Sequence, residues 1–427
     1  MIDITRREFI KAAGAAGLVG AFGGWLPAAR ARTSAQVVVV GGGFGGAAAA
    51  RYLKLLDPEI SVSLIERDRQ YVTCPMSNDY IGGNRAFDTL VHDFRALEEL
   101  GIAVHHDSVV NVDAERRRVV TQTGAEHPYD RLILAPGIDF RWDALEGYDA
   151  AAAQVMPHAW KAGPQTQLLR RQLQEMRDGG LFVMVAPDNP FRCPPGPYER
   201  ASLVANYLAT YNRRGKVLIL DPKDSFTKQE LFMQGWDELY PRGMIEWVPG
   251  SQGGTVERIE VNTRTIVTAA GAQQADVANV IPPQQAGMLA HTLGLTDETG
   301  FCPVDQRTFE STRVAGIHVI GDSCIAGEMP KSGVSANTQA KVCAHAVLDI
   351  LAEHEPTLPS LMNACFSLVG PTYGISVAAV YELTDKGITA VEGAGGVSPM
   401  DATPAQRRLE SVFWRSWYEN IVADTFG

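Results

Sequence analysis

The chain has 427 residues, enough for about two or three domains of ordinary size. Its apolar content of 45% and charged content of 20% are typical of globular proteins, and its net charge of −11 argues against nucleic-acid binding through phosphates. Six cysteines are too few for a disulfide scaffold at this length. No C-x-x-C or C-x-x-C-H motif indicates a zinc ribbon or a covalent haem, and no histidine pair has metal-ligand spacing.

The N-terminus is predicted to be an export signal. Paired arginines within residues 5–11 precede an apolar, small-residue stretch over residues 12–26 and an A-x-A-like cleavage site at residues 29–31. We therefore predict a twin-arginine signal peptide over residues 1–31 and a mature protein that begins near Arg32 in a bacterial periplasm. An amphipathic N-terminal helix is the alternative.

A dinucleotide motif follows directly. Four valines at residues 37–40 predict a buried parallel strand, and Gly41, Gly43 and Gly46 fit G-x-G-x-x-G before an alanine-rich helix. Glu66 ends the next strand about 20 residues later, where a carboxylate can bind ribose hydroxyls. The order of strand, glycines, helix, strand and acid predicts an ADP-containing cofactor, against a glycine turn without a ligand.

The rest of the first unit is predicted to complete its sheet. Residues 71–78 have the composition of a loop near the cofactor, and residues 117–121 and 129–134 are predicted strands. The second of these runs into Ala135-Pro136-Gly137, where two-domain flavoproteins leave their first domain. Gly137 is therefore expected to contact the cofactor.

A second α/β unit has the layout of a nicotinamide-binding domain without its phosphate loop. Residues 181–185 and 216–221 are predicted strands around a helix over residues 201–211. Between the first strand and the helix the sequence is rich in proline, which lacks the N–H groups that bind a pyrophosphate. Electrons are expected to leave by another route.

A later Gly-Asp pair identifies the cofactor. A strand ends at Gly321-Asp322, where the carboxylate can meet a ribityl chain, and a helix over residues 335–346 directs its N-terminus at the flavin. Together with the glycine motif this predicts FAD; a plain strand-turn is the alternative.

The predicted fold is α/β, with two Rossmann-like dinucleotide-binding domains of the glutathione-reductase type and an α+β C-terminal domain. No apolar run of membrane length follows the signal. The predicted domains are the FAD domain at 32–145 and 287–353, the second α/β domain at 146–286, and an interface domain at 354–427.

Five stretches carry a family resemblance. The sequence from residue 36 to 427 resembles the flavoprotein subunit of flavocytochrome c sulfide dehydrogenase, and its twin-arginine leader also fits. The motifs that carry the resemblance are Tyr71-Val72-Thr73-Cys74, Cys193-Pro194-Pro195-Gly196-Pro197-Tyr198-Glu199-Arg200, Met329-Pro330-Lys331-Ser332-Gly333, Asn363-Ala364-Cys365 and Tyr373-Gly374-Ile375-Ser376-Val377-Ala378-Ala379.

The resemblance implies roles for three cysteines. Cys74 matches the residue that binds the flavin 8α-carbon through sulfur, and Cys193 and Cys365 match the redox-active pair. Cys193 precedes a proline-started helix, whose dipole is expected to favour a thiolate. Glu199 is a candidate acid or base near the pair, or else a solvated helix-start residue. Purely structural roles for these cysteines are the alternative, and we expect Cys302, Cys324 and Cys343 to be structural.

The implied activity is oxidation of sulfide to persulfide or elemental sulfur, with electrons passed to a c-type cytochrome subunit. Three other activities remain open. One is a sulfide:quinone reductase, which shares the fold and a cysteine pair. The others are an NAD(P)H-dependent disulfide or persulfide reductase and an accessory flavoprotein of a periplasmic sulfur-oxidising complex.

Overall fold

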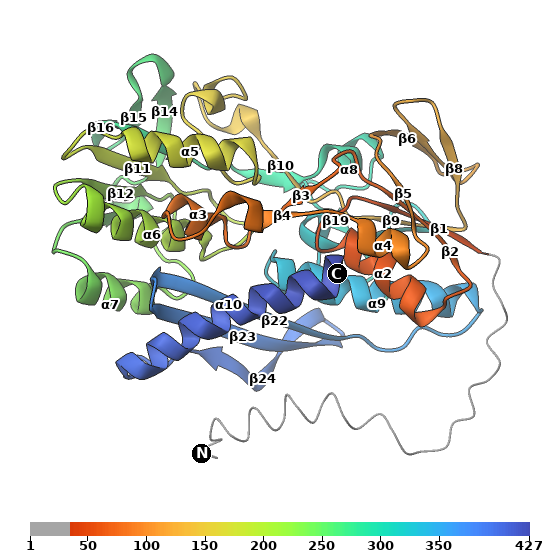
Figure 1. The fold of residues 1–427 in the computed structure, drawn as a ribbon. Helices are drawn as coiled ribbons and strands as arrows, with labels where there is room; N and C mark the ends of the chain where they lie inside the picture. The colour runs from red at the N-terminus through yellow and green to blue at the C-terminus, as the bar shows by residue number, and fades with distance from the viewer. Residues whose placement is uncertain (1–34) are drawn as a thin grey trace. The chain divides into compact units, whose positions relative to one another are not determined.

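The computed structural model describes residues 35–427, and the predicted signal at residues 1–31 lies outside them. The first sheet is parallel, with the strand order β20-β9-β1-β2-β5 (Figure 1). Its strands and the two helices beside it are β1 (Gln36–Val40), β2 (Ser61–Ile65), β5 (Ala103–His105), β9 (Arg131–Leu134), β20 (Ile317–Val319), α2 (Gly46–Leu56) and α9 (Gly333–Leu351).

The valine strand lies at the centre of this sheet because it is apolar on both faces. The side chains of Val37, Val38, Val39 and Val40 are all buried. The alanines at residues 47–50 are fully buried on α2, and their small size lets this helix pack closely against α9. The chain returns after about 180 residues to add β20 beside β9, with Ile317 opposite Leu132.

A second parallel sheet has the order β13-β12-β11-β17. Its helix α6 begins at Gly196, five residues before the predicted start, because Pro197 in the first turn already has a helical φ. The elements of this region are α5 (Pro164–Glu175), β11 (Leu181–Val185), α6 (Gly196–Tyr211), β12 (Lys216–Leu220), α7 (Gln229–Leu239), β13 (Ile245–Val248), β14 (Val256–Glu260), β15 (Thr265–Thr268), β16 (Gly271–Gln274) and β17 (Val277–Val280).

The C-terminal part is an antiparallel sheet with a long helix against it (Figure 1). Its elements are β22 (Ser360–Gly370), β23 (Tyr373–Thr384), β24 (Gly387–Val397) and α10 (Pro404–Phe426). Strand β22 packs against both α9 and α6, so it joins the two parallel-sheet units. Helix α10 begins at a capping box in which the Thr403 side chain accepts the Gln406 N–H.

Shorter elements complete the chain. The predicted loop at residues 71–78 contains the short strand β3 and the start of α3, so that prediction is partly wrong. These elements are β3 (Tyr71–Val72), α3 (Ser77–Ile81), β4 (Val91–His92), α4 (Arg95–Glu99), β6 (Val109–Asp113), β7 (Arg118–Thr121), β8 (Glu126–Pro128), β10 (Ile138–Phe140), β18 (Gln284–Ala286), α8 (Met288–Thr292), β19 (Cys302–Pro303) and β21 (Cys324–Ile325). Within residues 35–427, no helix combines the length and apolar character needed to cross a membrane.

Gly374→Ala is expected to destabilise the C-terminal part. A Cβ at Gly374 would lie 2.5 Å from the Ser411 nitrogen and 2.6 Å from the Glu410 carbonyl carbon, so α10 must move off β23. The expected cost is about 1–3 kcal/mol, measured as a lower thermal melting temperature. Gly396→Ala is the control, because nothing lies within 4 Å of its added Cβ. Equal melting temperatures for the two variants would contradict this packing argument.

Candidate active site

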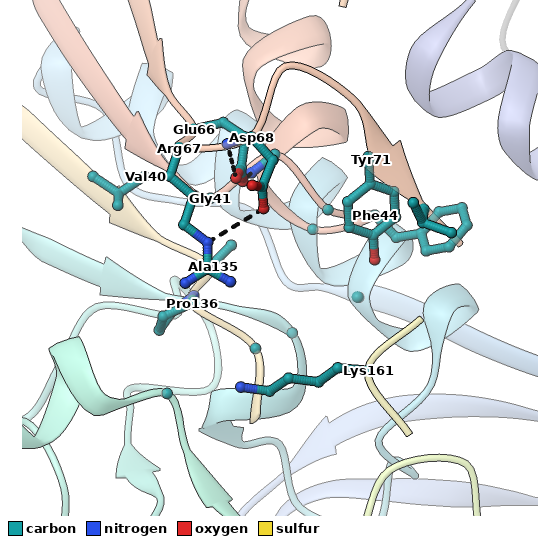
Figure 2. A pocket seen from close by; sticks show the side chains of 18 of the residues that line it. Val40, Gly41, Phe44, Glu66, Arg67, Asp68, Tyr71, Ala135, Pro136 and Lys161 are labelled. Carbon is teal, nitrogen blue, oxygen red and sulfur yellow. Dashed lines mark hydrogen bonds and ion pairs between the residues drawn. The ribbon is translucent and has the colours of Figure 1, made fainter. Parts of the chain in front are cut away.

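A cavity of about 1200 Å³ lies where the carboxyl ends of β1, β2, β9 and the residues after β20 meet. Ligands of open α/β sheets bind at this edge, because loops diverge there on either side of the sheet. Figure 2 shows the glycine loop, Glu66 and the Ala135–Pro136 turn together on its wall, with Tyr71 and Lys161 on other parts of the lining.

The glycine loop is as tight as the motif requires. Gly41 has a φ of +100°, and a Cβ there would lie 2.4 Å from the Ala135 carbonyl oxygen. A Cβ on Gly46 would lie 1.8 Å from the Gly41 carbonyl oxygen. Gly41 and Gly43 line the cavity, whereas Gly46 lies behind it and lets α2 start close to the loop. The loop therefore has no room for a side chain at Gly41 or Gly46.

Two carboxylates in the wall fit a dinucleotide. Glu66 Oε2 accepts the Gly42 N–H at 2.6 Å and its Oε1 accepts the Asp68 N–H at 3.0 Å, which holds the carboxylate beside the loop (Figure 2). Asp322 Oδ1 is buried without a hydrogen-bond partner in the described structure, although its residue lines the cavity. A buried unpaired acceptor calls for a donor from a ligand, as ribityl hydroxyls would provide.

The part of the cavity at the start of α9 favours a negatively charged group. Ser332 caps α9 by accepting the Ser335 N–H at 3.0 Å, and Gly333 and Ala336 of its first turn line the cavity. The positive end of a 19-residue helix therefore faces the cavity. Gly137, with a φ of +67°, lies on the wall as well. The residues present thus fit FAD.

Cys74 lies in the wall of the same cavity. Its side chain is half-buried, and its Sγ lies 3.3 Å from both the Trp160 carbonyl oxygen and Arg192 Nη2. Arg192 also lies 3.6 Å from Asp322 Oδ2. Arg192 therefore connects the Cys74 sulfur with the Asp322 carboxylate.

Residues 331–332, which lead into α9, are hydrogen-bonded to the backbone of Cys193 and to the strand that carries Cys365. The Cys193 N–H donates to the Lys331 carbonyl oxygen at 2.8 Å. Ser332 Oγ donates at 2.6 Å to Asn363 Oδ1, and Asn363 shares a face of β22 with Cys365 two residues on. All six cysteines, including this pair, are unbridged thiols in the structure.

Burial has the largest effect on the pKa of both cysteine thiols. It raises the pKa of the Cys193 thiol well above its usual value, and the neighbouring Cys365 and Glu199 add to that rise. Burial raises the pKa of Cys365 too, while Lys228 lowers it and Glu199 raises it. The prediction that the start of α6 favours a Cys193 thiolate is therefore wrong for the reduced pair, because desolvation outweighs the helix dipole.

Glu199 connects the elements that carry the two cysteines. Its side chain is buried on α6, not solvated, and burial raises its pKa. Oε1 accepts the Leu368 N–H from β22 at 2.9 Å, and Oε2 accepts from Asn78 Nδ2 at 2.8 Å. Both oxygens are engaged, so Glu199 holds β22 against α6 in this state.

Sequence reasoning missed two cations at the site, a half-buried arginine and a buried lysine. Arg192 immediately precedes Cys193, and this adjacency was a usable signal. Lys228 is 8% exposed and lies in the electrostatic surroundings of both cysteines. It follows Cys193 by 35 residues outside any motif, so only the fold reveals it. Within residues 35–427, no group of three His, Cys, Asp or Glu side chains could hold a metal ion.

The fold defines the class of the protein. A model of the pyridine nucleotide-disulphide oxidoreductases matches residues 35–174. The crystal structure of the sulfide:quinone oxidoreductase from Aquifex aeolicus has a TM-score of 0.73, with 16% identity and 92% of each chain covered. The predicted fold class is confirmed.

The family follows from more specific matches. Models of the central domain of the sulfide dehydrogenase (flavocytochrome c) flavoprotein chain and of the flavin-binding domain of flavocytochrome c sulphide dehydrogenase match residues 166–282 and 357–426. Such a flavoprotein chain from Chlorobaculum thiosulfatiphilum is 65% identical over 43 residues, 10% of this chain and 90% of that sequence. The chain belongs to the flavoprotein chains of flavocytochrome c sulfide dehydrogenase, as its motifs predicted.

A more distant relative is the mitochondrial sulfide:quinone oxidoreductase of Dictyostelium discoideum. It is 20% identical over 269 residues, which cover 59% of this chain and 56% of that protein. The chain thus spans little more than half the length of this relative.

Gly46→Ala is expected to abolish flavin binding, because its Cβ would overlap the Gly41 carbonyl oxygen and open the loop. The measurement is visible flavin absorbance per polypeptide after purification. Gly45→Ala is the matched control, since its Cβ would make ordinary contacts at 3.5 Å with Ala135 and Ile320. Full flavin content in Gly46→Ala would contradict the assignment of this loop.

Proposed function

We propose that this protein oxidises hydrosulfide at Cys193 and Cys365, with FAD as its cofactor and a c-type cytochrome as electron acceptor. The observations that carry the proposal are two hydrogen bonds made by residues 331–332. Cys193 donates its N–H to the Lys331 carbonyl oxygen, and Ser332, which lines the cavity, donates to Asn363 on the strand of Cys365. Sulfur chemistry at the pair is thereby adjacent to the cofactor site. The family match supports the same substrate.

Different residues of the chain would bind different parts of the cofactor. The glycine loop and Glu66 would bind the ADP part, and Asp322, Gly137 and the first turn of α9 would hold the flavin part. Bound FAD would supply a two-electron acceptor that can release its electrons singly. Cys74 is the proposed point of covalent attachment, because its thiol lies in the cavity wall beside Arg192.

The proposed sulfur step starts from the oxidised pair. Hydrosulfide attacks one sulfur of the Cys193–Cys365 disulfide, the S–S bond breaks, and one cysteine becomes a persulfide while the other leaves as a thiolate. A second hydrosulfide takes the outer sulfur of the persulfide as hydrodisulfide and leaves a thiol. Re-forming the disulfide then releases two electrons and one proton, so two hydrosulfides give one hydrodisulfide.

The second domain supports an acceptor other than a nicotinamide. In its loop after β11, the N–H groups of Ala186, Arg192 and Cys193 donate to internal acceptors, and the prolines carry none. Few donors are left for a pyrophosphate. The chain has no haem-binding C-x-x-C-H motif, so we propose a separate cytochrome partner. We also propose export by the twin-arginine route to the periplasm.

Sulfide:quinone oxidation is the second candidate. The Aquifex sulfide:quinone oxidoreductase has this fold, and the Dictyostelium protein of the same name is 20% identical over 269 residues. Sulfide-dependent reduction of a soluble c-type cytochrome, compared with a water-soluble ubiquinone analogue, distinguishes the two. Faster quinone reduction would favour the second candidate. No sulfide-dependent turnover with either acceptor would contradict both and favour an accessory flavoprotein.

Cys193→Ser and Cys365→Ser are each expected to keep bound flavin and to lose its anaerobic bleaching by sulfide, because a single thiol cannot form the disulfide that hydrosulfide attacks. Stopped-flow absorbance of the flavin band measures the rate of this bleaching. Cys343→Ala is the control, since Cys343 is fully buried within α9 and has no part in the proposed reaction. Bleaching of either serine variant at the native rate would rule out the disulfide mechanism.

Cys74→Ala is expected to release its flavin when the protein is denatured, whereas the native chain retains it. In-gel flavin fluorescence after denaturing electrophoresis is the measurement. Cys324→Ala, a buried cysteine outside the proposed attachment, is the control. Fluorescence that stays with the Cys74→Ala polypeptide would exclude this attachment.

A further inference from the structure

Lys228 is a buried lysine that the proposed reaction has not yet used. It precedes α7 in a left-handed conformation, with a φ of 63°, and is 8% exposed. Its ammonium donates to the carbonyl oxygen of Cys365 at 3.1 Å and to Ser367 Oγ at 2.8 Å. Both acceptors are neutral and both belong to β22, so Lys228 is anchored to the strand that carries Cys365.

The charge of Lys228 has no carboxylate directly against it. Among residues 35–427, no ion pair joins it to an aspartate or glutamate. The groups that face it are Cys365, Cys193, Glu199 and, from α10, Glu410. Glu199 accepts hydrogen bonds from Leu368 and Asn78 instead. A buried ammonium with neutral partners exerts its field on whichever neighbour next becomes negative.

We propose that Lys228 is the positioning residue that stabilises the thiolate of Cys365 when the pair is opened. In this step hydrosulfide bonds to Cys193 Sγ, the bond to Cys365 Sγ breaks, and its electron pair stays on Cys365. The persulfide forms on Cys193, and the negative charge of hydrosulfide moves to a sulfur beside Lys228. This inference rests on the proposed function for its role in turnover.

Lys228 acts on both thiols, but Cys365 depends on it more than Cys193 does. Among residues 35–427, Lys228 is the cation that acts on the Cys365 thiol, where Glu199 opposes it. Cys193 has Arg192 as a second cation. When Lys228 is removed, the charged neighbour left to Cys365 is Glu199, which disfavours the thiolate. Cys193 still has Arg192, which favours it.

The test measures Cys365 directly in the reduced holoenzyme. After reduction with dithiothreitol and its removal, iodoacetamide reacts with the thiolate form, and mass spectrometry of the Cys365 peptide follows the rate against pH. Lys228→Gln keeps N–H donors for β22 and removes the charge. We expect alkylation of Cys365 at neutral pH to slow about tenfold, the effect of a one-unit rise in thiol pKa.

Two variants separate charge from packing. Lys228→Arg keeps the charge and is expected to restore most of the alkylation rate, and Ser367→Ala removes one hydrogen bond of Lys228 and is expected to change it little. An unchanged rate in Lys228→Gln would overturn the proposal. So would an equal fall in the Gln and Arg variants, which would indicate a packing role. Flavin content and melting temperature establish that each variant is folded.

The readout does not depend on sulfide oxidation. If the native protein fails to oxidise sulfide while Lys228→Gln still slows alkylation, the proposed function is wrong and the effect of Lys228 on the thiolate stands. If the native protein oxidises sulfide and alkylation is unchanged by the variant, the proposed function stands and the role of Lys228 is wrong.

Discussion

The site depends on the hydrogen bonding of one short segment, residues 331–332. The carbonyl oxygen of Lys331 accepts the N–H of Cys193, and the hydroxyl of Ser332 binds Asn363 on the strand of Cys365. The same hydroxyl accepts the Ser335 N–H at the start of α9. One turn of backbone therefore joins the helix that faces the cavity to both cysteine-carrying elements.

The half-buried side chain of Lys331 keeps this segment in place. It donates to the carbonyl oxygens of Asp322 and Cys324 at 2.8 and 2.9 Å and lies 3.9 Å from the centre of the Phe301 ring. A cation that is partly removed from water needs such partners, so movement of the segment would leave this charge less well satisfied. The Asp322 carboxylate and the cysteine attachments are thus positioned by one network.

The second domain keeps the parallel sheet of a nucleotide-binding unit and uses its first loop differently. Where a glycine loop would expose N–H groups, Cys193 adopts a φ of 60° and its N–H is committed to Lys331. The domain surrounds the pair with charge from the buried side chains of Glu199 and Lys228 and the half-buried side chain of Arg192. Burying these groups is costly, and each is balanced by hydrogen bonds or by an opposite neighbour.

Local patterns determined the fold class and the cofactor edge. The valine run, the glycine spacing, Glu66 and Asp322 each depend on neighbours close in sequence, so their positions around the cavity were predictable. The family followed from motifs around Cys74 and the other cysteines, because such motifs keep their order along the chain. Lys228 and the bridging role of Glu199 depend on contacts across long sequence separations, and no local pattern encodes those contacts.

The sequence by itself thus determined the class of cofactor and the family, and it predicted which cysteines react. Only the tertiary structure decided the electrostatics of the cysteine pair. The helix start next to Cys193 predicted a more acidic thiol, yet burial raises its pKa, and one of the two cations that oppose this rise, Lys228, lies 35 positions away in the sequence. Desolvation and electrostatic interactions depend on all the residues packed around a group. Many of these residues are distant in the sequence, so a linear motif cannot predict them.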